Sequence, residues 1–177
     1  MLARAMMVRM TGQGDVASMT GAATETGVVL GAPGSPPTLG AVVELVGDPT
    51  RDEVRLPNRP ESAATARRLA EAVLRQGWAA PATTAEHAVL LVSELVGNAV
   101  RHTGASTFGL RMHRRRGRLR VEVRDPSRGL PCLLPVTEMD TSGRGLWLVD
   151  RLADRWGVDL LPRGKSTWFE MRLPDPR

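Results

Sequence analysis

The stretch SELVGNAVRHTG, from Ser93 to Gly104, decides how the chain is interpreted. Glu94, Asn98 and His102 recur at every fourth position, so on a helix they form one polar stripe. Such a stripe is either the solvent face of an amphipathic helix or the floor of a binding site. Which of the two holds depends on what the rest of the chain places near it.

Three segments have apolar residues at the 3.6-residue spacing of amphipathic helices. They are residues 61–77, residues 81–104, which contain the stripe, and residues 145–157. A glycine is expected to end each helix, because glycine is common just after a helix C-terminus. These glycines are Gly77, Gly104 and Gly157.

Alternating apolar residues predict strands at residues 52–57, 158–162 and 165–173, and a β-hairpin at residues 107–125 with its turn at 114–117. A short strand is also expected at residues 41–47, AVVELVG. The order is strand, two helices, hairpin, long loop, helix and hairpin. It predicts an α+β fold, a two-layer α/β sandwich whose mixed, mostly antiparallel sheet is covered by helices on one face.

The domain organisation follows from composition. Residues 1–50 are rich in small residues, glycine and proline without a sustained period, and are expected to form a disordered or poorly ordered leader. The compact domain is expected at residues 52–173. Cys132 is the only cysteine, which excludes an internal disulfide framework. No apolar run approaches the roughly 18 residues of a membrane helix, and the N-terminus does not fit a secretory signal, so a cytoplasmic protein without membrane contact is expected.

The charge does not predict nucleic-acid binding. The net charge is +5, but Lys165 is the only lysine among 24 basic residues, a skew that favours coding bias over a nucleic-acid patch. The basic run HRRRGRLR, residues 113–120, is expected to be the exposed turn and outer face of the hairpin. It lacks aromatic residues that could stack on bases. Direct DNA binding is therefore the least favoured function.

The loop of residues 124–145 is unusually long for a compact domain, and such loops are usually functional. Its end, Ser142–Gly145, enters a predicted helix, where free backbone N–H groups and the helix dipole suit a phosphate. At its start, Asp125 ends a strand and could accept a hydrogen bond from an amine such as that of adenine. An Asx-type turn explains Asp125 equally.

The residues Gly164-Lys165-Ser166 do not form a P-loop. The position five residues before the Gly-Lys pair is Asp159 instead of glycine, and the residues after Lys165 alternate like a strand. A lysine in such a turn is expected at the surface unless the turn faces a phosphate. No catalytic triad and no HExxH zinc motif is present.

Four motifs in order resemble the GHKL (Bergerat-fold) ATPase superfamily over residues 52–173. ELVGNAVRH resembles its N box and TSGRGLWLVDRLADRWG its G2 box, while GKSTWFEMRLP resembles its closing motif. RDPSRGLP resembles its G1 box, with Ser127 where the first glycine usually stands. The closest likeness is to stand-alone bacterial ATP-binding regulators, the anti-sigma factor serine/threonine-protein kinases.

The resemblance implies ATP and Mg²⁺ as ligands, and a role for each matching residue. Glu94 would be the general base, and Asn98 would hold Mg²⁺. Asp125 would accept the adenine amino group, supported by Thr167. The nucleotide-binding residues would be Asn98, His102, Asp125, Ser127, Gly129, Ser142, Gly143, Arg144, Gly145, Leu146, Lys165 and Thr167.

The function that the resemblance implies is an ATP-dependent protein serine/threonine kinase. It would bind a sigma factor or phosphorylate an antagonist of an anti-sigma factor, and so control transcription without touching nucleic acid. A nucleotide-binding regulator without kinase activity is the alternative. A homodimer is compatible with either.

Overall fold

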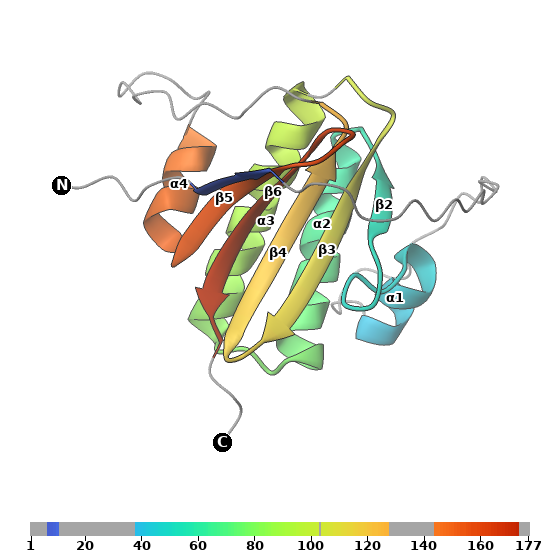
Figure 1. The fold of residues 1–177 in the computed structure, drawn as a ribbon. Helices are drawn as coiled ribbons and strands as arrows, with labels where there is room; N and C mark the ends of the chain where they lie inside the picture. Colours follow the sequence, from blue (N-terminus) through green and yellow to red (C-terminus); the bar gives the residue numbers. More distant parts are fainter. Residues whose placement is uncertain (1–6, 11–37, 103, 128–143, 174–177) are drawn as a thin grey trace.

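The computed structural model describes residues 7–10, 38–102, 104–127 and 144–173. One six-stranded sheet, in the order β1-β5-β6-β4-β3-β2, forms one layer, and the large helices pack on one of its faces (Figure 1). The predicted α+β two-layer sandwich is confirmed. The strands are β1 (Met7–Met10), β2 (Val54–Pro57), β3 (Thr107–Arg115), β4 (Arg118–Asp125), β5 (Arg155–Leu160) and β6 (Lys165–Arg172). The helices are α1 (Leu39–Val46), α2 (Glu61–Ala72), the π-helical turn η1 (Val73–Gly77), α3 (Ala82–His102) and α4 (Arg144–Leu152).

The sheet is mixed and mostly antiparallel, as expected. β1 pairs with β5 in parallel, and the four other pairings are antiparallel. The β3–β4 hairpin turns at Arg116 and Gly117, whose φ angles are 52° and 66°. A two-residue hairpin turn of type I′ requires positive φ at both positions. The turn is tighter than the predicted 114–117, because the strands run on to Arg115 and resume at Arg118.

The core lies between the sheet and the helices. Alternate residues of β4 and β6, such as Leu119, Val121 and Phe169, are fully buried on the helix-covered face. Opposite them, Leu91 and Val92 of α3 are also fully buried. The other face of the sheet carries polar and charged side chains at the intervening positions of β4, in a burial pattern that alternates along the strand.

The segment 41–47 is a helix, so the predicted short strand is wrong. It lies within α1, where the side chain of Thr38 caps the N-terminus by accepting a hydrogen bond from the Ala41 amide (3.4 Å). Val42 is buried in the core. The helical spacing of Leu39, Val42 and Val46 lets all three face the rest of the domain, which a strand of the same length would not allow. Both β1 and α1 fall inside residues 1–50, the range predicted as a disordered or poorly ordered leader.

Two of the three glycines lie at the end of their predicted helix. Gly104, with φ of +58°, follows α3 in the left-handed conformation. Gly77 is the last residue of η1 and so ends the helical segment, one position earlier than a residue following the helix, and the residue with positive φ after it is Ala79, at 48°. Gly157 lies inside β5, since α4 ends at Leu152.

The reason Gly157 belongs to a strand is close packing across the sheet. It pairs with Trp168, and a Cβ atom on Gly157 would overlap the indole ring and the Met7 carbonyl. Within the described residues, no helix combines the length and apolar character needed to cross a membrane.

Replacing Phe169 tests where the core lies. Phe169→Ala removes a fully buried ring between the sheet and the helices. We expect a loss of about 3–5 kcal/mol in the free energy of unfolding, measured by urea denaturation. Leu45→Ala is the control, because Leu45 is 50% exposed on α1, and a change within about 0.5 kcal/mol is expected there. Similar losses in both variants would contradict the core described above.

Candidate functional site

A buried polar cluster lies where β4 ends. Asp125 is 3% exposed, and its Oδ1 atom accepts hydrogen bonds from the Ser127 amide (2.9 Å) and the Ser127 hydroxyl (2.5 Å). The Lys165 ammonium lies 3.3 Å from the same oxygen and donates to the Ser127 hydroxyl at 2.5 Å. A buried carboxylate is thus held by a cation and two neutral donors.

The turn between β5 and β6 delivers Lys165 to this cluster. Gly164 has φ of +91°, and a Cβ there would overlap the Asp125 carbonyl and Pro126. The turn therefore lies directly on the end of β4, and Lys165 pairs with Asp125 across the strands. The surface position expected for Lys165 is wrong for this reason. The rejection of a P-loop is confirmed, because the residues after Lys165 form β6.

The Asx-type turn proposed for Asp125 is present, since its carboxylate accepts from the amide two residues on. The turn does not use both carboxylate oxygens of Asp125, because these hydrogen bonds all end on Oδ1. Thr167 lies nearby, paired with Val123 and 8% exposed. It shares the helix-covered face with Asp125, because Thr167 lies two residues from Lys165, the cross-strand partner of Asp125.

The polar stripe of α3 contributes the second part of the site. Glu94 is half-buried, and a Cβ on Gly145 would overlap its Oε2 atom, so the start of α4 lies directly on this carboxylate. Asn98 is half-buried too, and His102 is exposed. The stripe is therefore partly covered by α4 instead of fully facing solvent.

Arg101 is a neighbour of a predicted site residue that the sequence analysis did not include. Its Nη2 donates to Asn98 Oδ1 at 3.1 Å, and its guanidinium packs beside Gly97. The two residues are three apart on a helix, which places their side chains next to each other. That spacing was the available signal.

The start of α4 carries the remaining predicted residues. Gly145 and Leu146 lie in its first turn, and Leu146 is 5% exposed in the core. Arg144 is described only as the first residue of the helix. Gly129, Ser142 and Gly143 lie outside the described residues.

The two parts of the site meet through α3. This helix packs against α4 on one side and against β4 and β6 beneath it (Figure 1). The structure thus joins Glu94 to Gly145, and Asp125 to Ser127 and Lys165, on the same face of the sheet. Both parts lie on the layer that the helices cover.

The donor set near Asn98 suits Mg²⁺ bound through a nucleotide. Over the described ranges, no group of three or more His, Cys, Asp or Glu side chains could hold a metal ion by itself. Mg²⁺ commonly takes one or two protein oxygens and completes its shell with phosphates and water. The Asn98 side-chain oxygen can be one such ligand once Arg101 releases it.

A family comparison decides which kind of domain this is. Residues 56–172 match the family model for the histidine kinase-like ATPase domain. The chain belongs to the histidine kinase-like ATPase family. The GHKL resemblance of its motifs is thereby confirmed. No curated protein matches the chain.

Among solved structures, the RsbU and RsbW domains of Rv1364c from Mycobacterium tuberculosis are similar at 21% identity and a TM-score of 0.47, covering 71% of this chain and 33% of that one. The blue-light activated histidine kinase EL346 of Erythrobacter litoralis is similar at 30% identity and a TM-score of 0.40, covering 53% and 32%. Its histidine kinase domain gives 26% identity and a TM-score of 0.42, covering 76% and 70%. The chain therefore spans about a third of the first two structures.

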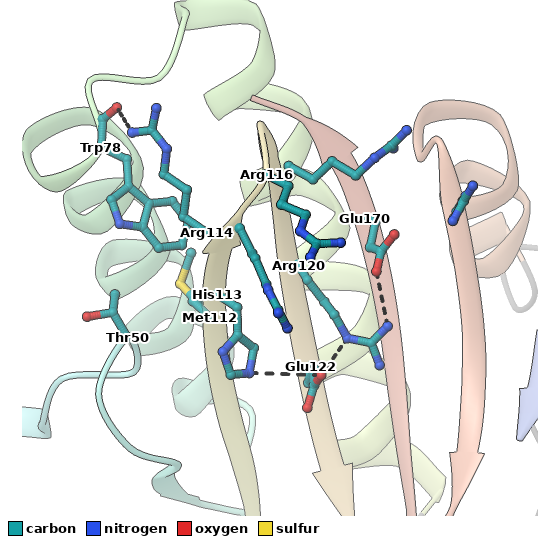
Figure 2. Close-up of a pocket in the computed structure, with 12 residues that line it drawn as sticks. Thr50, Trp78, Met112, His113, Arg114, Arg116, Arg120, Glu122 and Glu170 are labelled. Atoms are coloured by element: carbon teal, nitrogen blue, oxygen red, sulfur yellow. Dashed lines mark hydrogen bonds and ion pairs between the residues drawn. The ribbon is translucent and has the colours of Figure 1, made fainter. Parts of the chain in front are cut away.

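A separate cavity of about 860 Å³ lies at the other end of the sheet, around the β3–β4 turn (Figure 2). Arg120 lies within it and is bonded to Glu122 (2.5 Å) and Glu170 (3.3 Å). Its guanidinium also stacks on Trp168, 3.9 Å from the ring centroid. This cavity shares no residue with the predicted nucleotide site.

The basic run is only partly the exposed turn that the sequence predicted. Arg115 and Arg116 are exposed, as expected. Arg114 is half-buried and donates to the Trp78 carbonyl at 3.0 Å. Arg120 is half-buried in its acidic network, which holds its pKa above the ordinary value despite the opposing effect of burial.

Gly145 tests the contact between α3 and α4. Gly145→Ala places a methyl group where Glu94 Oε2 lies. We expect the Glu94 side chain to turn aside, because the overlapping atom is its flexible end, and the free energy of unfolding to fall by at most about 1 kcal/mol. Gly40→Ala is the control, since a Cβ there meets nothing within 4 Å. It should leave stability equal or raise it by up to about 1 kcal/mol. Equal losses in urea denaturation would contradict the close contact.

His113 predicts a pH dependence of stability. Burial lowers the pKa of His113 below its ordinary value of 6.5, opposed by Glu122 at 4.0 Å and aided by Arg111 and Arg120. The unfolded chain thus binds this proton more readily, and stability falls as pH drops below 6.5. His113→Gln should flatten that fall in urea titrations, while the two proteins keep parallel curves above about pH 8. A variant as steep as wild type below 6.5 would contradict this assignment.

Proposed function

We propose that the chain binds Mg²⁺–ATP and transfers its γ-phosphoryl group to a serine or threonine of a protein partner. The observation that carries the proposal is the buried Asp125 carboxylate, which faces the α3 layer within a histidine kinase-like ATPase domain. A buried carboxylate is costly unless hydrogen-bonded, and its free oxygen suits the exocyclic amine of adenine.

The other half of the site suits the phosphates. Asn98 is the residue that would hold Mg²⁺, which when bound neutralises phosphate charge. Arg101, now bonded to Asn98, adds a cation that can turn to the phosphates. The N-terminus of α4, beginning at Arg144, adds the positive end of a helix dipole and backbone N–H groups of its first turn.

Glu94 supplies the chemistry in this proposal. Its carboxylate takes the proton of the attacking hydroxyl as the oxygen bonds to the γ-phosphorus. The bond from that phosphorus to the β-phosphate oxygen breaks, and ADP leaves. Packing against Gly145 holds the carboxylate in one orientation, as a positioned base requires.

The partners proposed are those that the motif resemblance implies. The chain would bind a sigma factor, or phosphorylate an antagonist of an anti-sigma factor. Neither role requires contact with DNA. A homodimer and a cytoplasmic location belong to the same proposal.

Nucleotide binding is tested by thermal denaturation with Mg²⁺–ATP. A ligand selective for the folded state raises the melting temperature as its concentration exceeds the dissociation constant. Asp125→Asn should lose that shift, because its amide cannot both satisfy Lys165 and accept the adenine amine. An undiminished shift in this variant would contradict the placing of adenine at Asp125.

Catalysis is tested by separating two residues of the α3 stripe. Glu94→Gln keeps the shape packed on Gly145 and should bind ATP as wild type does, while phosphoryl transfer falls by about 10²–10⁴. Asn98→Ala should weaken both binding and transfer, because it removes the metal ligand. Affinity is measured by calorimetry and transfer with labelled ATP and candidate antagonist proteins.

Glu86→Gln is the matched control, an exposed glutamate on the same helix. It should change neither quantity. Parallel losses of affinity in the Glu94 and Asn98 variants would contradict their separate roles. A wild-type protein that binds ATP but phosphorylates no candidate would favour a nucleotide-binding regulator without kinase activity.

A further inference from the structure

The cluster of Asp125, Ser127 and Lys165 is more elaborate than an amine acceptor needs. Both charged groups are buried, with side chains 3% and 7% exposed. Burying an ion pair costs desolvation that the pair itself barely recovers. A single buried carboxylate hydrogen-bonded to backbone amides would accept adenine equally well. The lysine offsets the cost of burying the Asp125 charge, and because it reaches the same oxygen as Ser127 it also decides which carboxylate oxygen stays available.

What distinguishes the cluster is that its donors converge on one oxygen. The Ser127 amide, the Ser127 hydroxyl and the Lys165 ammonium all reach Asp125 Oδ1, at 2.9, 2.5 and 3.3 Å. Each carboxylate oxygen has about two lone-pair positions, so Oδ1 has no capacity left. Within the described part of the chain, no hydrogen bond ends on Oδ2. The carboxylate thus presents one acceptor to a ligand instead of two.

A one-acceptor carboxylate discriminates between purines. Adenine offers one exocyclic amine beside a ring nitrogen that accepts. Guanine offers an N1–H and an exocyclic N2–H side by side, a pair that fits a carboxylate with both oxygens available. If only Oδ2 can accept, one of these two guanine donors is left unpaired in a buried site, which costs binding energy.

We propose that Lys165 and Ser127 clamp Asp125 by its Oδ1 atom, and that this clamp selects adenine nucleotides over guanine nucleotides. The inference rests on the proposed function, in which Asp125 meets the base. Lys165 and Ser127 are positioning residues, because they act through the carboxylate.

The clamp also accounts for a departure in the sequence. Ser127 stands where the G1 motif usually has its first glycine. Its hydroxyl donates to Asp125 and accepts from Lys165, so it joins the two charged groups. Glycine would supply the amide bond alone. Gly164, whose close approach to Asp125 tolerates no side chain, brings the lysine within reach.

The test compares three nucleotides on wild type and on the double variant Lys165→Met/Ser127→Ala. Dissociation constants for the Mg²⁺ complexes of ATP, GTP and ITP are measured by calorimetry, with circular dichroism confirming that each protein is folded. ITP has the N1–H of GTP but lacks the N2 amine. The GTP/ITP ratio, meaning the affinity for GTP divided by the affinity for ITP, therefore reports whether the second donor is accepted.

Wild type should bind ATP best and should bind GTP and ITP equally weakly, since one guanine donor finds no acceptor. In the double variant Oδ1 keeps only the backbone amide and can accept a second hydrogen bond. The affinity for GTP should then rise about tenfold relative to that for ITP, the effect of one satisfied buried donor. A purely structural role would lower all three affinities together and leave the ratio unchanged.

Three further variants keep the test decisive. Arg163→Met removes an exposed cation from the same turn and should change no ratio. Should this double variant not fold, Lys165→Leu/Ser127→Ala likewise leaves only the backbone amide on Oδ1 and should strengthen GTP binding relative to ITP in the same way. Ser127→Ala alone leaves two donors on Oδ1 and should keep the relative affinities of wild type. An unchanged ratio in every folded double variant of a wild type that binds ATP overturns the clamp alone. A wild type that binds no nucleotide overturns the proposed function and the clamp together.

Discussion

The packing of α3 across β4 and β6 is the constraint on which the rest of the structure depends. Leu91, Val92, Leu95 and Val96 are buried to within 2% of full burial, and they fix both the height and the rotation of the helix over the sheet. Once that apolar face packs on the sheet, the direction in which the polar face of α3 points is fixed. Glu94 must lie at the border between α3 and α4.

The same packing explains why polar groups can gather at one end of the core. The apolar side chains of β4 end at Val123, and Asp125 takes the next inward position. A carboxylate there is stable because a lysine and a serine are brought to it from the neighbouring strand turn and the following loop. The interior is therefore apolar beneath the middle of α3 and polar at the end of β4.

The face of the sheet that the helices leave uncovered is stabilised by paired charges. Arg120 lies between Glu122, Asp159 and Glu170 and stacks on Trp168, so its charge is matched from three strands. Such cross-strand pairs stabilise a sheet face that no helix of the described residues covers. Arginine at this position is a structural residue, whatever the abundance of arginine in the chain. The basic character of the sequence thus serves the sheet in part.

The sequence by itself determined the fold class, the three main helices, the antiparallel hairpin and the family, because these depend on periodicity and on motifs that are local in the chain. The polar stripe of α3 could also be predicted from the sequence, since helical spacing alone puts Glu94 and Asn98 on one face. Only the tertiary structure decided that Gly157 belongs to a strand and that residues 39–46 form a helix, because packing against Trp168 and the core outweighs local preference. It alone placed Lys165 on Asp125: the two residues are 40 positions apart, and no local pattern reports that a glycine turn lets one strand end lie on another.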